Sequence, residues 1–175
     1  MKSAARDLRS LIKDVQDFPK KGIVFKDITP LLADAQAFAD AIDQMAAPFA
    51  DRGIALVAGI ESRGFLLAGP VAQRLKAGVT LIRKKGKLPR KTVGVTYSLE
   101  YGEDSLEAHA DAVPAGTKVL VVDDVLATGG TAAAACQLVE KLGGSVEGLS
   151  FLMELAFLRG RAKLDGREIR ALLAY

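Results

Sequence analysis

The sequence predicts an α/β fold in which helices flank a mainly parallel central sheet. Three short apolar runs, LVAGI ending at Ile60, VTLIR ending at Arg83 and KVLVVDD ending at Asp124, have the length and composition of strands buried on both faces. Helical patterns alternate with these runs, which is typical of a parallel sheet. With 175 residues, 50% of them hydrophobic, the chain fits one domain, 1–175, around a single core.

The N-terminal part predicts two helices. Apolar residues at helical spacing predict a first helix of about four turns, which ends before Pro19 and Gly22: Leu8, Leu11, Ile12 and Val15. A second helix is expected over about 35–51, and its apolar stripe consists of Phe38, Ile42, Met45 and Phe49. Both stripes indicate ordinary core packing.

The remaining elements follow the same alternation, with one exception. GFLLAGPVAQRLKAG predicts a helix closed by Gly78, TAAAACQLVEKLGG predicts one closed by Gly143 and Gly144, and VEGLSFLMEL predicts the next strand. The exception is 92–111, where VGVTYSLEY and SLEAHAD alternate like half-exposed strands on either side of a turn at 102–104. We expect a hairpin carried on top of the sheet.

Composition excludes several classes of protein. No apolar run approaches the roughly 20 residues that cross a bilayer, and the first residues lack the apolar core of a secretory signal, so we expect a cytoplasmic protein with no membrane partner. The single Cys136 excludes an internal disulfide, and we expect it to be a small buried thiol. The single His109 is expected to be a polar residue of a strand or turn. Six of the 24 Lys and Arg lie within 83–91, so the net charge of +3 is local and predicts no nucleic-acid partner.

VVDDVLATGGT, over 121–131, carries the strongest functional signal. Ligands of open α/β sheets bind at the carboxyl ends of the strands, and we expect 123–131 to be a loop at such an end. Small residues and hydroxyls there offer backbone N–H and O–H donors at a helix N-terminus, which suits a phosphate monoester: Ala127, Thr128, Gly129, Gly130 and Thr131. The spacing matches neither the nucleotide-triphosphate loop nor the dinucleotide fingerprint.

Asp123 and Asp124 would repel a phosphate, so we expect them to face another group. Sugar hydroxyls and a metal ion are both candidates, because a carboxylate accepts hydrogen bonds from a vicinal diol and also binds hard cations. A sugar carrying a 5′-phosphate on the loop would present its 2′ and 3′ hydroxyls nearby. Whether either aspartate also ligates a metal is left open.

This motif resembles the phosphoribosyl-pyrophosphate motif of the type I phosphoribosyltransferases. Other pieces in the same order are similar to the adenine-specific branch of that family: FPKKGIVFKDITPLL, GIESRGFLLAGPVA, RKKGKLP and TYSLEYG. The resemblance implies the type I phosphoribosyltransferase fold, with a small hood and base-recognition segment over about 1–34 and a flexible β-hairpin catalytic loop over about 83–105.

The resemblance also implies roles for residues outside the phosphate loop. Pyrophosphate would be bound by Glu61, Ser62, Arg63, Arg83 and Lys87, with a cis peptide between Glu61 and Ser62. Catalysis would involve Arg63, Lys87 and Glu100, the last in proton handling at the purine, with Tyr101 as a neighbouring hood residue. Adenine would contact Val24, Phe25, Lys26 and Leu155. Lys26 stands where arginine is common in the family, and Lys21 where proline is common.

The implied activity is purine salvage: adenine and 5-phosphoribosyl 1-pyrophosphate give AMP and pyrophosphate, with Mg²⁺ carried by the donor as cofactor. The resemblance implies a homodimer. Two alternatives stay open, namely a transferase for hypoxanthine, guanine or xanthine on the same scaffold, and a regulator that senses phosphoribosyl pyrophosphate and binds nucleic acid.

Overall fold

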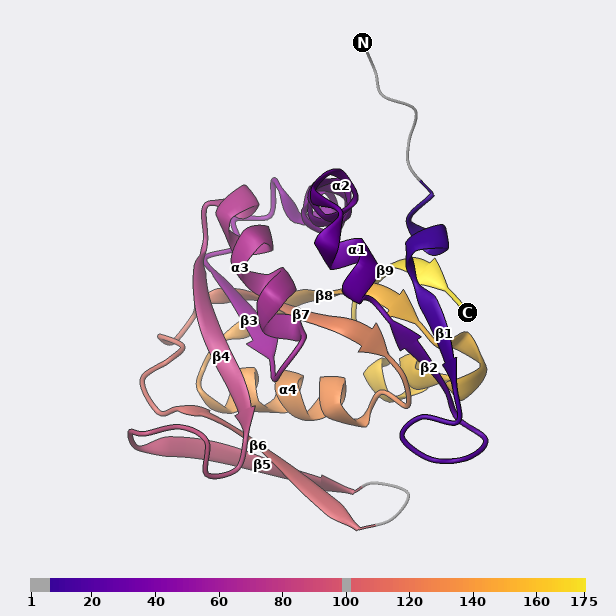
Figure 1. Cartoon of the computed structure of the whole chain (residues 1–175). Helices are drawn as coiled ribbons and strands as arrows, with labels where there is room; N and C mark the ends of the chain where they lie inside the picture. The colour runs from indigo at the N-terminus through magenta and orange to yellow at the C-terminus, as the bar shows by residue number, and fades with distance from the viewer. Residues whose placement is uncertain (1–6, 99–101) are drawn as a thin grey trace. The chain divides into compact units, whose positions relative to one another are not determined.

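The computed structural model describes residues 7–98 and 102–175 (Figure 1). The chain forms two compact units, Met1–Asp43 and Gln44–Tyr175. The predicted single domain, with its N-terminal segment ending near residue 34, stays a prediction. Over the described ranges, none of the helices combines the length and the hydrophobicity that a membrane span requires.

The first unit contains an antiparallel strand pair where the sequence predicted a helix of four turns. A 3-10 helix, η1 (Leu8–Leu11), is capped by Asp7 and gives way to β1 (Lys13–Gln16), which pairs with β2 (Val24–Asp27). The helix prediction was wrong because the periodicity ignored β2, whose backbone supplies hydrogen bonds across the turn at Gly22, where φ is +89°. The predicted break at 19–22 is confirmed as this turn.

Two helices follow in this part of the chain. They are α1 (Thr29–Ala33) and α2 (Ala35–Ala46), whose last residues already belong to the second unit, and a 3-10 turn, η2 (Ala47–Phe49), follows α2. The predicted helix over 35–51 therefore ends as a 3-10 segment with Pro48 in its first turn. Met45 and Phe49 of the predicted stripe are fully buried.

A seven-stranded sheet with the order β5-β6-β4-β3-β7-β8-β9 forms the second unit (Figure 1). The central pairs β3–β4, β3–β7, β7–β8 and β8–β9 are parallel, which confirms the predicted fold class. The bounds are β3 (Leu56–Ile60), β4 (Gly78–Lys84), β5 (Thr92–Ser98), β6 (Glu103–His109), β7 (Lys118–Leu126), β8 (Ser145–Glu154) and β9 (Ile169–Ala174).

The β5–β6 hairpin continues the edge of this sheet, so its expected position on top of the sheet was wrong. β6 pairs antiparallel with the end of β4, where Arg83 faces Glu107 and Lys84 faces Leu106. The two strands pair over their whole lengths. Antiparallel pairing lets β4, which has no other neighbour on this side, satisfy its backbone groups at the carboxyl end.

Helices cover both faces of the sheet. In Figure 1, α3 (Gly64–Leu75) lies on one face and α4 (Gly130–Lys141) on the other. The expected end of α3 at Gly78 was wrong: Lys76 takes the left-handed conformation, with φ +55°, and β4 begins at Gly78. The core under α4 includes Cys136, whose free thiol is buried as predicted, and burial raises its pKa to about 11.

Two further 3-10 turns, η3 (Ala156–Leu158) and η4 (Gly160–Leu164), connect β8 to β9. Gly160 begins η4 and is itself buried. This connection lies against the segment that leaves β7, because a Cβ on Gly160 would meet the carbonyl oxygen of Ala127 at 2.2 Å.

Candidate active site

A cavity of about 570 Å³ opens at the carboxyl ends of the sheet strands, where β3 and β7 lead into α3 and α4. This position is the one expected for a ligand site in an open α/β sheet. The structure brings nine of the predicted site residues together in its wall: Glu61, Ser62, Arg63, Asp123, Asp124, Ala127, Thr128, Gly129 and Thr131.

The phosphate-loop prediction is corrected in its boundaries. β7 runs to Leu126, so both aspartates belong to the strand, and only 127–129 separates it from α4. The hydrogen bonds of the sheet therefore fix the two carboxylates more firmly than a loop would. The predicted strand ended at Asp124, two residues before the observed end at Leu126, and Asp124 is only 4% exposed.

Backbone contact between glycines fixes the shape of this short loop. Gly129 has φ +80°, and a Cβ there would lie 2.2 Å from the carbonyl oxygen of Gly160. No larger residue fits without moving one of the two backbones. The loop then enters α4, whose first turn has no side-chain cap, and Gly129 and Thr131 on either side of this helix start line the cavity. A helix N-terminus favours a bound anion.

The two aspartates share one cation. Arg63 Nε lies 2.9 Å from Asp124 Oδ2, and the Asp124 backbone N–H donates to Asp123 Oδ1 over 2.9 Å. Burial raises the pKa of Asp123 well above its ordinary value, and the negative charge of Asp124 adds to this rise. Burial also raises the pKa of Asp124, while Arg63 opposes the rise. Hydrogen-bond donors or a cation at this position would therefore stabilise the ionised form of both carboxylates.

Gly64, the first residue of α3, permits this arrangement. A Cβ there would lie 2.8 Å from Asp123 Oδ1 and 3.0 Å from the carbonyl oxygen of Val122. The start of α3 and the end of β7 thus touch through backbone and carboxylate.

The predicted pyrophosphate residues form a second charged group. Glu61 accepts hydrogen bonds from Arg83 and from the Lys84 backbone N–H at 3.0 Å, and the Glu61–Ser62 peptide is cis, as the resemblance implied. Burial alone would raise the pKa of Glu61, but these bonds outweigh burial and lower it. Arg83 Nη1 also donates to the carbonyl oxygen of Lys87 over 3.0 Å. Neither Arg83 nor Lys87 lines the cavity, so their roles stay predictions.

Three polar residues of the cavity were missed by the sequence reasoning. Lys84 Nζ lies 3.0 Å from Asp104 Oδ2, and the Tyr97 hydroxyl lies 3.4 Å from the same oxygen. The Tyr97 hydroxyl is also 3.2 Å from Thr131 Oγ1. Lys84 stood in the basic run 83–91 and Tyr97 in the TYSLEYG match, but nothing local to Asp104 pointed to the site.

The predicted adenine contacts fall into two groups. Val24, Phe25 and Lys26 lie on β2 of the first unit, where Phe25 packs edge-on to Phe18 and Lys26 Nζ lies 2.6 Å from Asp14 Oδ1. Leu155 belongs to the second unit and lines a smaller cavity of about 160 Å³ beside Glu154 and Arg159. Their contact with a base stays a prediction.

Glu100 and Tyr101 lie outside the described residues. Gly130 is the first residue of α4 and does not line the cavity. Within 7–98 and 102–175, no group of three or more His, Cys, Asp and Glu side chains is arranged to hold a metal ion.

The cavity lies at the carboxyl end of a parallel sheet and contains most of the residues that were predicted to bind a sugar phosphate. Residues 27–158 match the family described as "Phosphoribosyl transferase domain". A curated adenine phosphoribosyltransferase from Anaeromyxobacter sp. (strain Fw109-5) is 56% identical over 175 residues, which are 100% of this chain and 99% of that protein.

Solved structures agree with the sequence comparison. The adenine phosphoribosyltransferase of Thermoanaerobacter pseudethanolicus has a TM-score of 0.94 and 51% identity, covering 97% of this chain and 98% of that one. The enzyme of Saccharomyces cerevisiae, solved with an imino-altritol bisphosphate and adenine, has a TM-score of 0.90 and 40% identity, with 95% and 97% covered. The chain belongs to the phosphoribosyltransferase family and, within it, to the adenine phosphoribosyltransferases.

Proposed function

We propose that this chain transfers the 5-phosphoribosyl group from 5-phosphoribosyl 1-pyrophosphate to adenine, giving AMP and pyrophosphate in purine salvage. One observation carries the proposal: a single cavity is lined by the loop 127–129, by Thr131, by the Asp123–Asp124 pair and by Arg63. A sugar phosphate needs anion donors and hydroxyl acceptors side by side, and this cavity offers both.

The loop and the aspartates divide the donor between them in this proposal. Backbone N–H groups of 127–131 and the hydroxyls of Thr128 and Thr131 would bind the 5′-phosphate at the start of α4. Asp123 and Asp124 would accept hydrogen bonds from the 2′ and 3′ hydroxyls of the ribose. Hydrogen bonds to the ionised carboxylates favour ionisation, which opposes the burial that raises their pKa values.

The reaction breaks the bond between C1′ and the pyrophosphate oxygen and forms the bond between C1′ and N9 of adenine. N9 loses its proton, and pyrophosphate leaves with the electron pair of the broken bond. Positive charge develops at C1′ in the transition state, and the buried carboxylates stabilise it electrostatically. Arg63 offers its positive charge to the leaving pyrophosphate. Glu100 is proposed to handle the proton at the purine.

Mg²⁺ is proposed as the cofactor. Two carboxylates without a third protein ligand among the described residues fit an ion that takes most of its ligands from phosphate oxygens and water. Asp123 and Asp124 are the residues that would contact such an ion. When bound, Mg²⁺ neutralises charge on the leaving pyrophosphate.

The proposal extends to a cytoplasmic homodimer. Leu66, Val79 and Leu81 are 52%, 44% and 42% exposed. Val79 and Leu81 share a sheet face with α3, because Leu81 is in register with Gly59, whose Cβ would touch Ala68. A second copy would cover this apolar face, and Leu81→Lys should then shift the sedimentation profile from dimer to monomer. The proposed cytoplasmic location is supported by Cys136, because a free thiol stays reduced in the cytoplasm.

A pyrophosphate-release assay with the donor, Mg²⁺ and separate adenine, guanine, hypoxanthine, xanthine and uracil tests the proposed function. We expect kcat/KM for adenine to exceed that for every other base. Equal use of hypoxanthine or guanine would overturn adenine specificity, and no release with any base would overturn the transferase activity. Omission of Mg²⁺, with EDTA present, should stop release.

A further inference from the structure

The cavity contains an ion pair that the proposed function does not use. Lys84, the last residue of β4, reaches Asp104 of β6, with Nζ 3.0 Å from Oδ2. Both side chains line the cavity together with the predicted donor-binding residues. A carboxylate in a site for a highly charged anion is unfavourable for that anion, so the position of Asp104 needs a reason.

Asp104 is the fixed partner of this pair. Its Oδ1 accepts the Ser105 backbone N–H at 2.8 Å, and its Oδ2 accepts the Tyr97 hydroxyl at 3.4 Å. Burial alone would raise the pKa of Asp104, but the contacts with Lys84 and with the Ser105 backbone outweigh burial and lower it. The carboxylate is therefore charged at neutral pH and held in place on the hairpin.

Lys84 is the exchangeable partner. Its side chain is 59% exposed, against 24% for that of Asp104. A lysine on a flexible stem, in an exposed pair, loses little free energy when it changes partner, because such pairs contribute about 0–1 kcal/mol. An anion in the cavity can therefore take Lys84 from Asp104 at small cost.

Tyr97 connects the pair to the phosphate loop. Its hydroxyl lies 3.2 Å from Thr131 Oγ1, and its ring lies 3.5 Å from the position that a Cβ on Gly130 would occupy. The Asp104 carboxylate is thus anchored through Tyr97 against the first turn of α4. The carboxylate therefore keeps a fixed position to which Lys84 can return.

We propose that Asp104 is a positioning residue that competes with pyrophosphate for Lys84, holding the lysine in the empty site and reclaiming it when the product leaves. The proposal rests on the proposed function, since pyrophosphate is the product of that reaction. Asp104 acts through Lys84. By competing for the lysine, Asp104 lowers the affinity of the site for pyrophosphate and so speeds the release of pyrophosphate.

Titration of the full-length protein with inorganic pyrophosphate and Mg²⁺ in a calorimeter tests the role of Asp104. We expect Asp104→Asn, which keeps shape and hydrogen bonding to Tyr97, to lower the Kd for pyrophosphate about threefold. Asp104→Ala should shift Kd in the same direction. In steady-state assays the Asp104→Asn variant should show a lower KM for the donor, stronger inhibition by pyrophosphate and a lower kcat.

Two controls separate this role from a general change of charge. Asp111→Asn removes a carboxylate that is likewise ion-paired, with Arg90 at 2.6 Å, but does not line the cavity, and it should leave Kd unchanged. In a Lys84→Gln background, Asp104→Asn should have no further effect on Kd. An unchanged or weaker Kd for Asp104→Asn alone, or an equal shift in the Lys84→Gln background, would overturn the proposal. Absence of turnover in the wild-type protein would instead refute the proposed function, because pyrophosphate binding is measured without a base.

Discussion

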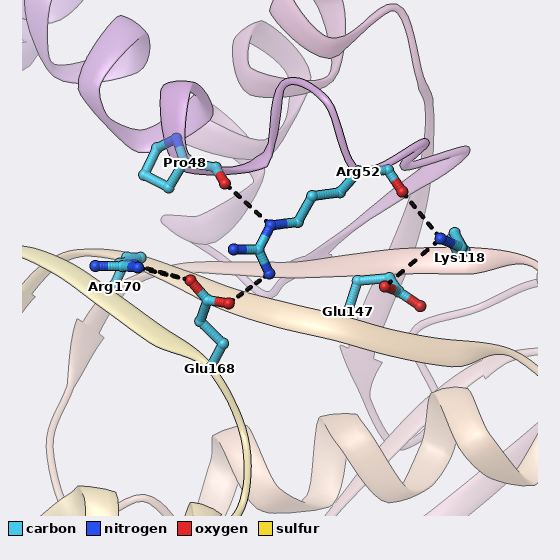
Figure 2. Close-up of polar contacts among 6 residues, drawn as sticks. All are labelled: Pro48, Arg52, Lys118, Glu147, Glu168 and Arg170. Carbon is cyan, nitrogen blue, oxygen red and sulfur yellow. Dashed lines mark hydrogen bonds and ion pairs between the residues drawn. The ribbon is translucent and has the colours of Figure 1, made fainter.

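Charged side chains gather at both ends of the parallel strands, and the two groups differ in what they surround. At the carboxyl ends, Arg63, Arg83 and Lys84 pair with carboxylates that line the cavity. At the amino ends, Arg52 and Lys118 belong to a network with Glu147, Glu168 and Arg170 (Figure 2). None of these five amino-end residues lines either cavity described above.

The amino-end network ties separate segments of the sheet and its connections together. Arg52 is ion-paired with Glu168 and donates to the Pro48 carbonyl over 3.1 Å (Figure 2). Its guanidinium also lies over the Phe49 ring. Lys118 donates to the Arg52 carbonyl over 3.1 Å. These contacts hold chain segments together away from either cavity, whereas the carboxylates of the carboxyl-end group line the cavity and are available to a ligand. The amino end should therefore govern stability and the carboxyl end activity.

The largest effect should come from the aspartate pair. Asp123→Asn with Asp124→Asn should lower kcat/KM for the donor about a hundredfold or more, because the carboxylates for the ribose and for the transition-state charge are lost. The melting temperature should not fall, since the fold raises the pKa of both groups and gains nothing from their ionisation. Normal turnover in the double variant would overturn the ribose assignment.

The glycine contact in the loop should have the next largest effect. Gly129→Ala places a Cβ 2.2 Å from the Gly160 carbonyl oxygen at φ +80°, so the loop must move, and KM for the donor should rise about tenfold to a hundredfold. Gly116→Ala is the matched control, because Gly116 has φ +77° and no atom within 4 Å of the added Cβ. It should cost about 1 kcal/mol of stability and leave KM unchanged. Similar KM values in both variants would show that the loop does not bind the donor.

Arg52→Ala, at the amino end, should lower the stability of the protein and leave its activity almost unchanged. The loss of its contacts with Glu168, the Pro48 carbonyl and the Phe49 ring should lower the free energy of unfolding by about 1–2 kcal/mol, measured by urea denaturation. kcat/KM for both substrates should stay within about twofold of the wild-type value, because no contact with the cavity is lost. A large rise in donor KM would remove the functional distinction between the two ends.

The smallest expected effect is on the pH dependence of the melting temperature. Neutralising a carboxylate should lower the melting temperature at the amino end and raise it at the carboxyl end. Bonds from Arg52 and then Arg170 lower the pKa of Glu168, so its stabilising contribution is present above the ordinary value of 4.5 and is lost as pH falls through the lowered pKa. Glu168→Gln should therefore melt below wild type at pH 7, and the gap should close in acid.

Ionisation of Asp123, in contrast to that of Glu168, should destabilise the fold, because the pKa of Asp123 is raised. Its ionisation opposes folding only as pH rises above the ordinary value of 3.8 toward and past the raised pKa. Asp123→Asn should thus melt above wild type at pH 8, with the difference disappearing at low pH. Melting curves across pH measure both variants, and equal signs at neutral pH would contradict the comparison.

Secondary-structure elements that are determined by their own residues could be predicted from the sequence. β3 was predicted to its residues because LVAGI is apolar throughout and is followed directly by the polar Glu61. The start of β1 could not, because Lys13–Gln16 is a strand only through its pairing with β2. Helical spacing of apolar residues describes one chain segment and carries no information about a partner strand.

The site divides in the same way. The loop and the aspartates are contiguous in the sequence, so their chemistry could be recognised directly. The Lys84–Asp104 pair depends on the antiparallel register of β4 with β6, which places Lys84 opposite Leu106. No spacing rule gives that register from the residues alone, because it is set by where the hairpin joins the sheet edge.

Cys136 gives the chain an internal reporter. It is the single cysteine of the sequence, it is fully buried in α4 under the sheet, and the thiolate needed for alkylation is suppressed by a pKa of about 11. Modification by iodoacetamide therefore requires α4 to detach from the sheet. The donor would bind at the first turn of that helix. The rate of alkylation, followed by mass spectrometry with and without donor, therefore measures how strongly donor binding hinders the opening of the core.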